Sequence, residues 1–66
     1  MTALARLSAN AFVRAAPCAG SAPLGVAHRG DALLCAGRST PDGWRAVHWN
    51  GRIGWVWGGL AKILKE

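Results

Sequence analysis

Short runs of apolar residues, separated by segments rich in glycine, proline and serine, make up most of this chain. Strand-like runs of apolar, β-branched and aromatic residues occupy 32–36, 44–49 and 52–57. Residues 15–25 and 37–43 hold Gly, Pro and Ser at short intervals, which predicts a long loop and a turn cluster. Nine glycines and three prolines among 66 residues favour many turns over long helices. The pattern therefore predicts an all-β fold.

The first residues give a weaker signal. Leu4, Leu7 and Ala11 have the spacing of a weak helical pattern. An N-terminal arm or a first strand fits residues 1–11 equally well. The chain is long enough for one domain only, so we expect such an arm or strand to precede a single folded unit at residues 12–66.

The sharpest local signal is Asn50-Gly51, which lies between two strand-like runs. Asn-Gly is favoured in two-residue type I′ hairpin turns, because both central residues there have positive φ. Such a turn fixes the register and places Trp44 opposite Trp57, unless a bulge intervenes. One face of the hairpin then carries Trp44, Ala46, His48, Ile53, Trp55 and Trp57. The other face carries Arg45, Val47, Trp49, Arg52, Gly54 and Val56. Both faces hold large apolar groups, so alternation alone leaves open which one is the core.

Several short motifs follow one another along the chain. They are Phe12-Val13-Arg14-Ala15-Ala16-Pro17, Leu24-Gly25, Gly30-Asp31-Ala32-Leu33-Leu34-Cys35-Ala36-Gly37, Gly43-Trp44-Arg45-Ala46-Val47 and Asn50-Gly51-Arg52-Ile53-Gly54-Trp55-Val56. Their order and spacing resemble the bacterial SH3-like domain family, over residues 12–61. The resemblance implies a small, strongly bent, five-stranded SH3-like barrel over residues 12–66. It also implies a long loop after the first strand, with the short N-terminal arm in front.

The same resemblance implies an inside and a binding groove. Val47 and Val56 match core valines of the family, which turns Trp44 outward. Trp44, Trp57 and Leu60 match positions that line the ligand groove of SH3-like domains. Paired tryptophans supply a large, rigid contact area with little rotamer entropy to lose. We therefore expect an exposed Trp44/Trp57 platform that binds a ligand.

Basic residues outnumber acidic ones. Eight Lys and Arg against three Asp and Glu give a net charge of +5, which attracts polyanions such as nucleic acid and anionic wall polymers. The eight cations are scattered along the chain, which favours a solubilising surface. Arg14 and Arg38 are candidate ligand-binding residues beside the groove, with ordinary solvated arginines as the alternative interpretation.

Two cysteines and two histidines raise the question of a disulfide or a metal site. Without a secretion signal, Cys18 and Cys35 are expected to be reduced thiols. A zinc site that included His28 and His48 would need close ligand pairs, which these spacings lack. We expect no metal and no cofactor.

Groups for catalysis are scarce. Asp31 and Asp42 fall in predicted turns, at residues 28–31 and 37–43, where carboxylates bond to backbone groups. Glu66 is the remaining carboxylate. The glycines lack phosphate-loop spacing, and nothing marks an activated nucleophile. We therefore expect that the protein is not an enzyme.

Three functions are compatible with these features. The first is a non-catalytic binding module for cell-wall peptides or another extended ligand, as the resemblance implies. The second is a structural or adaptor subunit of a larger assembly or oligomer, such as a tail or capsid accessory protein of a phage virion. The third is nucleic-acid binding, by positive charge and by stacking of bases on tryptophan.

The first residues also bear on location. The opening segment lacks the basic and then apolar regions of a signal peptide, because Arg6 interrupts it. No apolar run approaches the length of a membrane span. We expect a cytoplasmic or virion-associated product.

Overall fold

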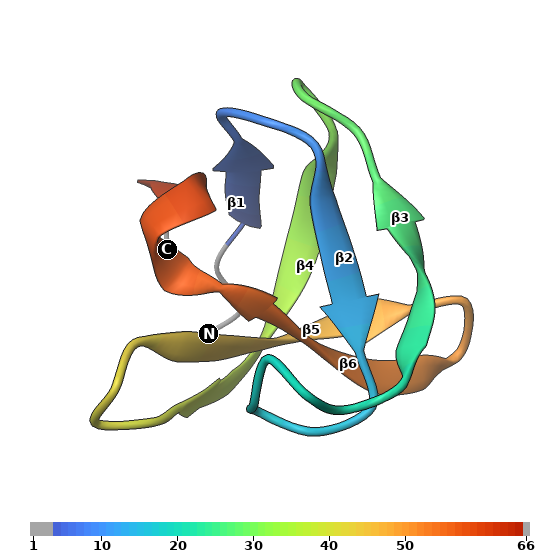
Figure 1. The fold of residues 1–66 in the computed structure, drawn as a ribbon. Helices are drawn as coiled ribbons and strands as arrows, with labels where there is room; N and C mark the ends of the chain where they lie inside the picture. The colour runs from blue at the N-terminus through green and yellow to red at the C-terminus, as the bar shows by residue number, and fades with distance from the viewer. Residues whose placement is uncertain (1–3, 66) are drawn as a thin grey trace.

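Seven antiparallel strands form one sheet, in the order β3-β2-β6-β5-β4-β1-β7 (Figure 1). The computed structural model describes residues 4–65, and the side chains of residues 4–63. The strands are β1 (Leu4–Leu7), β2 (Ala11–Arg14), β3 (Pro23–Ala27), β4 (Ala32–Ser39), β5 (Trp44–Trp49), β6 (Arg52–Trp57) and β7 (Ala61–Lys65), and a 3-10 turn, η1 (Gly58–Leu60), precedes β7. The prediction of an all-β fold is confirmed. Between residues 4 and 65, no helix has the length and apolar character needed to cross a membrane.

The expectation of five strands is wrong, because there are seven and their hydrogen-bonded order is open, with β3 and β7 at its two ends. One extra strand, β3, lies partly within residues 15–25, which the sequence predicts as loop. Pro23 is tolerated because it begins a strand at the edge of the sheet. Gly25 is favoured because the Trp49 ring packs on it, 3.0 Å from the site of a Cβ atom. Pro23 and Gly25, which the sequence pattern assigns to a loop, therefore belong to an edge strand.

The N-terminal segment contributes an inner strand of the sheet, next to the edge strand β7. β1 pairs with both β4 and β7, and it turns Ala5 and Leu7 into the core, 0% and 2% exposed. The weak helical spacing therefore gives no helix between Leu4 and Ala11. Residues 1–3 of the expected arm lie outside the described residues.

The hairpin register predicted from Asn50-Gly51 is confirmed. Asn50 and Gly51 have φ values of 47° and 80°, as a type I′ turn requires. The β5–β6 ladder runs without a bulge from the pair nearest the turn to Trp44 opposite Trp57.

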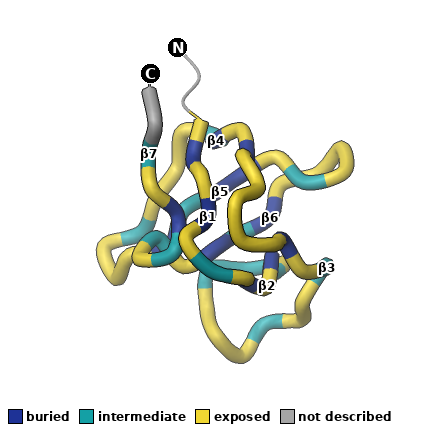
Figure 2. Tube along the Cα trace, turned by 90° about the horizontal axis from the view of Figure 1, so that it is seen from above, coloured by how far each residue is buried: buried dark blue, intermediate teal, exposed yellow. Residues whose placement is uncertain are grey.

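The buried side chains settle which face of this hairpin is the core. Val47 and Val56 are fully buried, together with Val13 of β2, and Figure 2 shows buried positions alternating with exposed ones along the strands. The expectation of Val47 and Val56 inside is confirmed. Gly54 is needed on the same face, because a Cβ atom there would overlap the Cγ1 atom of Val13.

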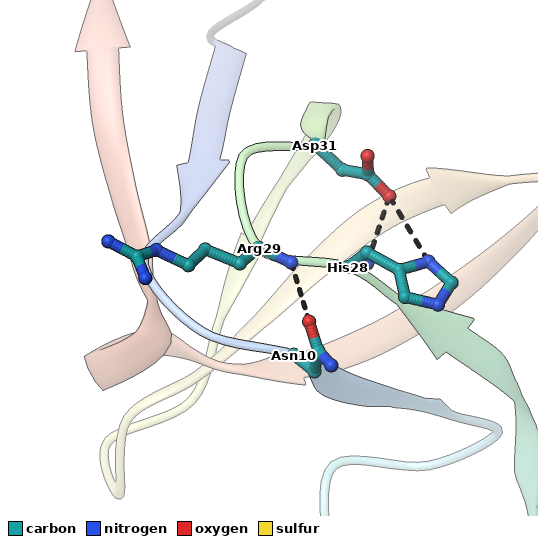
Figure 3. A network of polar contacts seen from close by, with 4 residues as sticks. All are labelled: Asn10, His28, Arg29 and Asp31. Atoms are coloured by element: carbon teal, nitrogen blue, oxygen red, sulfur yellow. Dashed lines mark hydrogen bonds and ion pairs between the residues drawn. The ribbon is translucent and has the colours of Figure 1, made fainter.

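The predicted turn at residues 28–31 is also confirmed, and it fixes the start of β2 (Figure 3). The backbone N–H of His28 donates to Oδ2 of Asp31 at 2.9 Å, and the Asp31 N–H donates to the His28 carbonyl at 2.9 Å. The Arg29 N–H donates to Oδ1 of Asn10 at 2.8 Å. Asn10 directly precedes β2, so this bond ties β2 to the turn that begins β4.

Candidate ligand-binding groove

A groove of about 550 Å³ lies where β2, the loop after it, the β4–β5 turn, the facing ends of β5 and β6, and η1 come together. Its lining residues are Asn10, Ala11, Phe12, Arg14, Cys18, Ala19, Asp42, Trp44, Trp57 and Leu60. The volume is in the range of small-ligand sites. Four of the five predicted site residues line it, namely Trp44, Trp57, Leu60 and Arg14, whereas Arg38 does not.

Two tryptophans form one wall of the groove. Trp44 and Trp57 are opposite each other in the β5–β6 ladder, and their rings meet edge to face, with centroids 5.5 Å apart and planes at 71°. Trp57 is 43% exposed, whereas Trp44 is only 8% exposed. The expectation of an exposed platform is thus correct for Trp57 and wrong for Trp44. Trp57 packs against Trp44, so Trp44 forms the buried base and Trp57 the accessible surface.

Glycines hold the Trp57 ring in place. Gly43 has φ of +105°, and a Cβ atom there would lie 3.2 Å from the Cη2 atom of Trp57. A Cβ atom on Gly59 would lie 2.9 Å from the indole nitrogen. The Gly58 N–H donates to the Gly43 carbonyl at 2.7 Å, and a side chain at Gly58 would collide with that same oxygen. A side chain at any of these glycines would therefore crowd the Trp57 ring or the backbone beneath it.

The β4–β5 turn carries a carboxylate to the rim of the groove. Thr40 organises this turn, since its Oγ1 accepts a hydrogen bond from the Trp44 N–H at 3.0 Å. The same hydroxyl donates to Oδ1 of Asp42 at 2.6 Å. The Gly43 N–H closes the turn by donating to the Thr40 carbonyl at 3.0 Å. Asp42 is exposed but fixed in direction, and its second oxygen can accept a bond from a ligand.

Strand β2 contributes a cation on an aromatic ring to the groove lining. The guanidinium of Arg14 lies 5.2 Å from the centre of the Phe12 ring, and its Nη1 donates to the Ser21 carbonyl at 2.7 Å. Phe12 is 53% exposed, so it presents an open face to the solvent. Arg38 is near the C-terminal end of β4, where it is exposed and lies outside the groove. Arg14 is therefore the predicted arginine that the fold brings to the groove.

The two cysteines are both free thiols in different environments. Cys18 is exposed and lines the groove. Cys35 is buried, and this desolvation raises the pKa of its thiol, while the charge of Arg45 acts in the opposite direction. Groups of three or more histidine, cysteine or acidic side chains placed to hold a metal do not occur within residues 4–65.

Thiol chemistry should separate these two cysteines. At pH 8 a soluble alkylating reagent is expected to modify Cys18 at least ten times faster than Cys35, because the reactive thiolate must be both accessible and formed. Mass spectrometry of peptides after timed quenching measures both rates, and Cys18→Ser should remove the fast phase alone. Equal rates for the two thiols in the folded protein would contradict the burial of Cys35.

Sequence reasoning missed Phe12, Asp42 and Cys18 as groove residues. Phe12 occupies the position where the resembled family usually has Asn, so the family pattern gives it no binding role. Asp42 and Cys18 lie in segments read only as turn and loop. Their approach to Trp57 depends on contacts between distant parts of the chain. Comparisons of the chain with protein-family models, curated proteins and solved structures found no match.

Proposed function

We propose that this chain is a non-catalytic binding module with an SH3-like barrel fold, which holds an extended ligand in the groove beneath Trp57. The observation that carries the proposal is the Trp44–Trp57 pair, of which one ring is buried and the other accessible in a concave site. Rigid aromatic residues in a partly desolvated hollow are typical of the residues that dominate binding energy.

The connectivity supports the proposed fold. Strands β1, β4, β5, β6 and β7 form a continuous stretch of the sheet in the order β6-β5-β4-β1-β7. The long loop expected at residues 15–25 connects β2 to β3 and includes the first residues of β3. The proposed likeness to SH3-like domains therefore rests on this antiparallel order of strands and not on a count of five.

The groove chemistry favours a peptide with polar ends. Most of the lining is aromatic or aliphatic, so extended chains with apolar groups can lie across Trp57 and Leu60. Arg14 and Asp42 add one cation and one carboxylate, which suit the carboxylate and amine of a short peptide. Cell-wall cross-linking peptides carry both groups. We therefore infer that such peptides, free or within the wall, are the ligand class.

Co-sedimentation with purified bacterial cell walls tests this proposal. The folded protein should be retained saturably, and retention should persist at raised salt because apolar contact is not screened. Arg14→Gln should weaken retention several-fold, while Arg38→Gln, with the same loss of charge outside the groove, should not. No retention on walls of any type would refute the proposal, as would equal losses for both arginine variants.

A further inference from the structure

The outer face of β7, β1 and β4 carries two cations side by side. Arg6 and Lys62 are directly opposite each other in the β1–β7 ladder, and both side chains are exposed. Like charges in this position repel and destabilise a sheet. Among the side chains of residues 4–63, the contact of a basic with an acidic group is that of His28 with Asp31, at 4.0 Å, and it involves neither Arg6 nor Lys62. The Arg6–Lys62 repulsion is therefore left uncompensated within this part of the chain.

An exposed apolar row runs beside these cations. Leu4 is paired with Leu34 across β1 and β4, and they are 41% and 43% exposed. The next pair, Cys35 with Val47, points into the core, so Leu34 and His48 point outward. His48 is in turn paired with Ile53, which is 43% exposed. The row crosses four strands, a distance of about 14 Å.

The cations and the apolar row share one surface. Leu4 and Arg6 are two residues apart on β1, so their side chains project from the same face, and Figure 2 shows β7, β1 and β4 side by side. We name this surface the outer face and define it by Leu4, Arg6, Leu34, Ile53 and Lys62. None of these residues lines the groove.

We propose that the outer face docks a second, different protein, through a segment in which acidic side chains lie beside apolar ones. Carboxylates would relieve the Arg6–Lys62 repulsion, and apolar side chains would cover Leu4, Leu34 and Ile53. Charge complementarity excludes a second copy of this chain as the occupant, because the chain has three acidic residues against eight basic ones. Two of these carboxylates, Asp31 and Asp42, each accept one hydrogen bond within a turn, and Asp42 lies at the groove.

Nucleic acid fits this face less well than a protein segment. Phosphates would pair with Arg6 and Lys62 but would leave the apolar row exposed to water. A partner that uses both halves of the surface must itself be amphipathic.

Amide chemical shifts of the labelled protein test this proposal with defined probes. The probe is a capped peptide of about eight alternating Glu and Leu residues, long enough to cross the row. Three controls share one of its properties: alternating Lys and Leu, alternating Glu and Ser, and oligo-deoxythymidylate. The Glu-Leu peptide should shift the amides of Leu4, Arg6, Leu34 and Lys62, and should bind at least ten times more tightly than each control.

Variants separate docking from simple attraction to charge. Arg6→Glu should weaken binding of the Glu-Leu peptide at least ten-fold, and Leu34→Ser should weaken it several-fold. Arg38→Glu makes the same charge change away from both surfaces and should alter affinity less than three-fold. Circular dichroism should show each variant folded, and Lys62→Gln replaces Arg6→Glu if the latter unfolds. No binding, equal binding of the Glu-Ser peptide or the oligonucleotide, or shifts confined to the groove would overturn the proposal.

Discussion

Gly54→Ala is expected to lower the free energy of unfolding by about 2–3 kcal/mol, the upper part of the range of about 1–3 kcal/mol by which overpacked cores lose stability. A domain of this size has only about 3–5 kcal/mol in total. The added Cβ atom would overlap Cγ1 of Val13, which is fully buried. Val47, paired with Gly54 across the hairpin, is fully buried as well. The core therefore has no direction in which to relax, and urea unfolding followed by circular dichroism should show a much lower midpoint.

Gly20→Ala is the matched control for this variant. No atom lies within 4 Å of the Cβ position at Gly20, and its φ is not positive. The free energy of unfolding should change by less than about 0.5 kcal/mol, as for surface substitutions without special contacts. If both alanine variants unfold at the wild-type midpoint, the close packing of β2 on β6 is wrong.

Trp57→Ala is expected to reduce binding to cell walls at least ten-fold while the protein stays folded. The ring is the accessible aromatic surface of the groove, and truncation of such a residue commonly costs about 2 kcal/mol or more of binding energy. Its stability effect should be smaller than that of Gly54→Ala, because Trp57 is 43% exposed. Trp44 is a poorer choice for this test, since it is 8% exposed and its loss would disturb packing and binding together.

Ile53→Ala provides the control for the tryptophan variant. Ile53 is on the same strand and is also 43% exposed, but it does not line the groove. Its removal should leave wall binding within two-fold of wild type. A similar loss of binding for both variants would mean that general apolar exposure, and not the groove, retains the protein.

Local signals determined which parts of the fold could be predicted. Asn50 and Gly51 adopt the positive φ values of a type I′ turn, and this single turn fixes every pair of the hairpin, including Trp44 with Trp57. Which face of the β5–β6 hairpin is buried could not be predicted from local sequence. Alternation left two apolar faces, and only packing against Val13 of β2 makes one of them the core.

The strand that was missed, β3, and the first strand, which was left open as an alternative to an arm, depend on contacts far along the chain. β3 begins with Pro23 and contains Gly25, which are loop signals unless the strand is at an edge and a tryptophan ring needs the space. Likewise, β1 has only four residues, too few for a clear alternation of apolar and polar positions. It is a strand because β4 and β7 lie on either side of it.

In the candidate site too, local sequence predicts some residues, whereas others depend on contacts between distant parts of the chain. Trp44 and Trp57 were found because one hairpin brings them together, and Leu60 follows closely in the chain. Nothing in the spacing distinguishes Arg14 from Arg38. Arg14 is held at the groove because its side chain donates a hydrogen bond to the Ser21 carbonyl, in the connection that follows β2.

The most direct test of the groove is an amide chemical-shift map of the labelled protein during titration with soluble cell-wall peptide fragments. The indole N–H of Trp57 and the amides of Phe12, Cys18, Asp42 and Leu60 should show the largest saturable shifts. In Trp57→Ala, these amide shifts should be lost at the same ligand concentration. Saturable shifts centred on the outer face, or no shifts with any wall peptide, would contradict the assignment of this groove as the binding site.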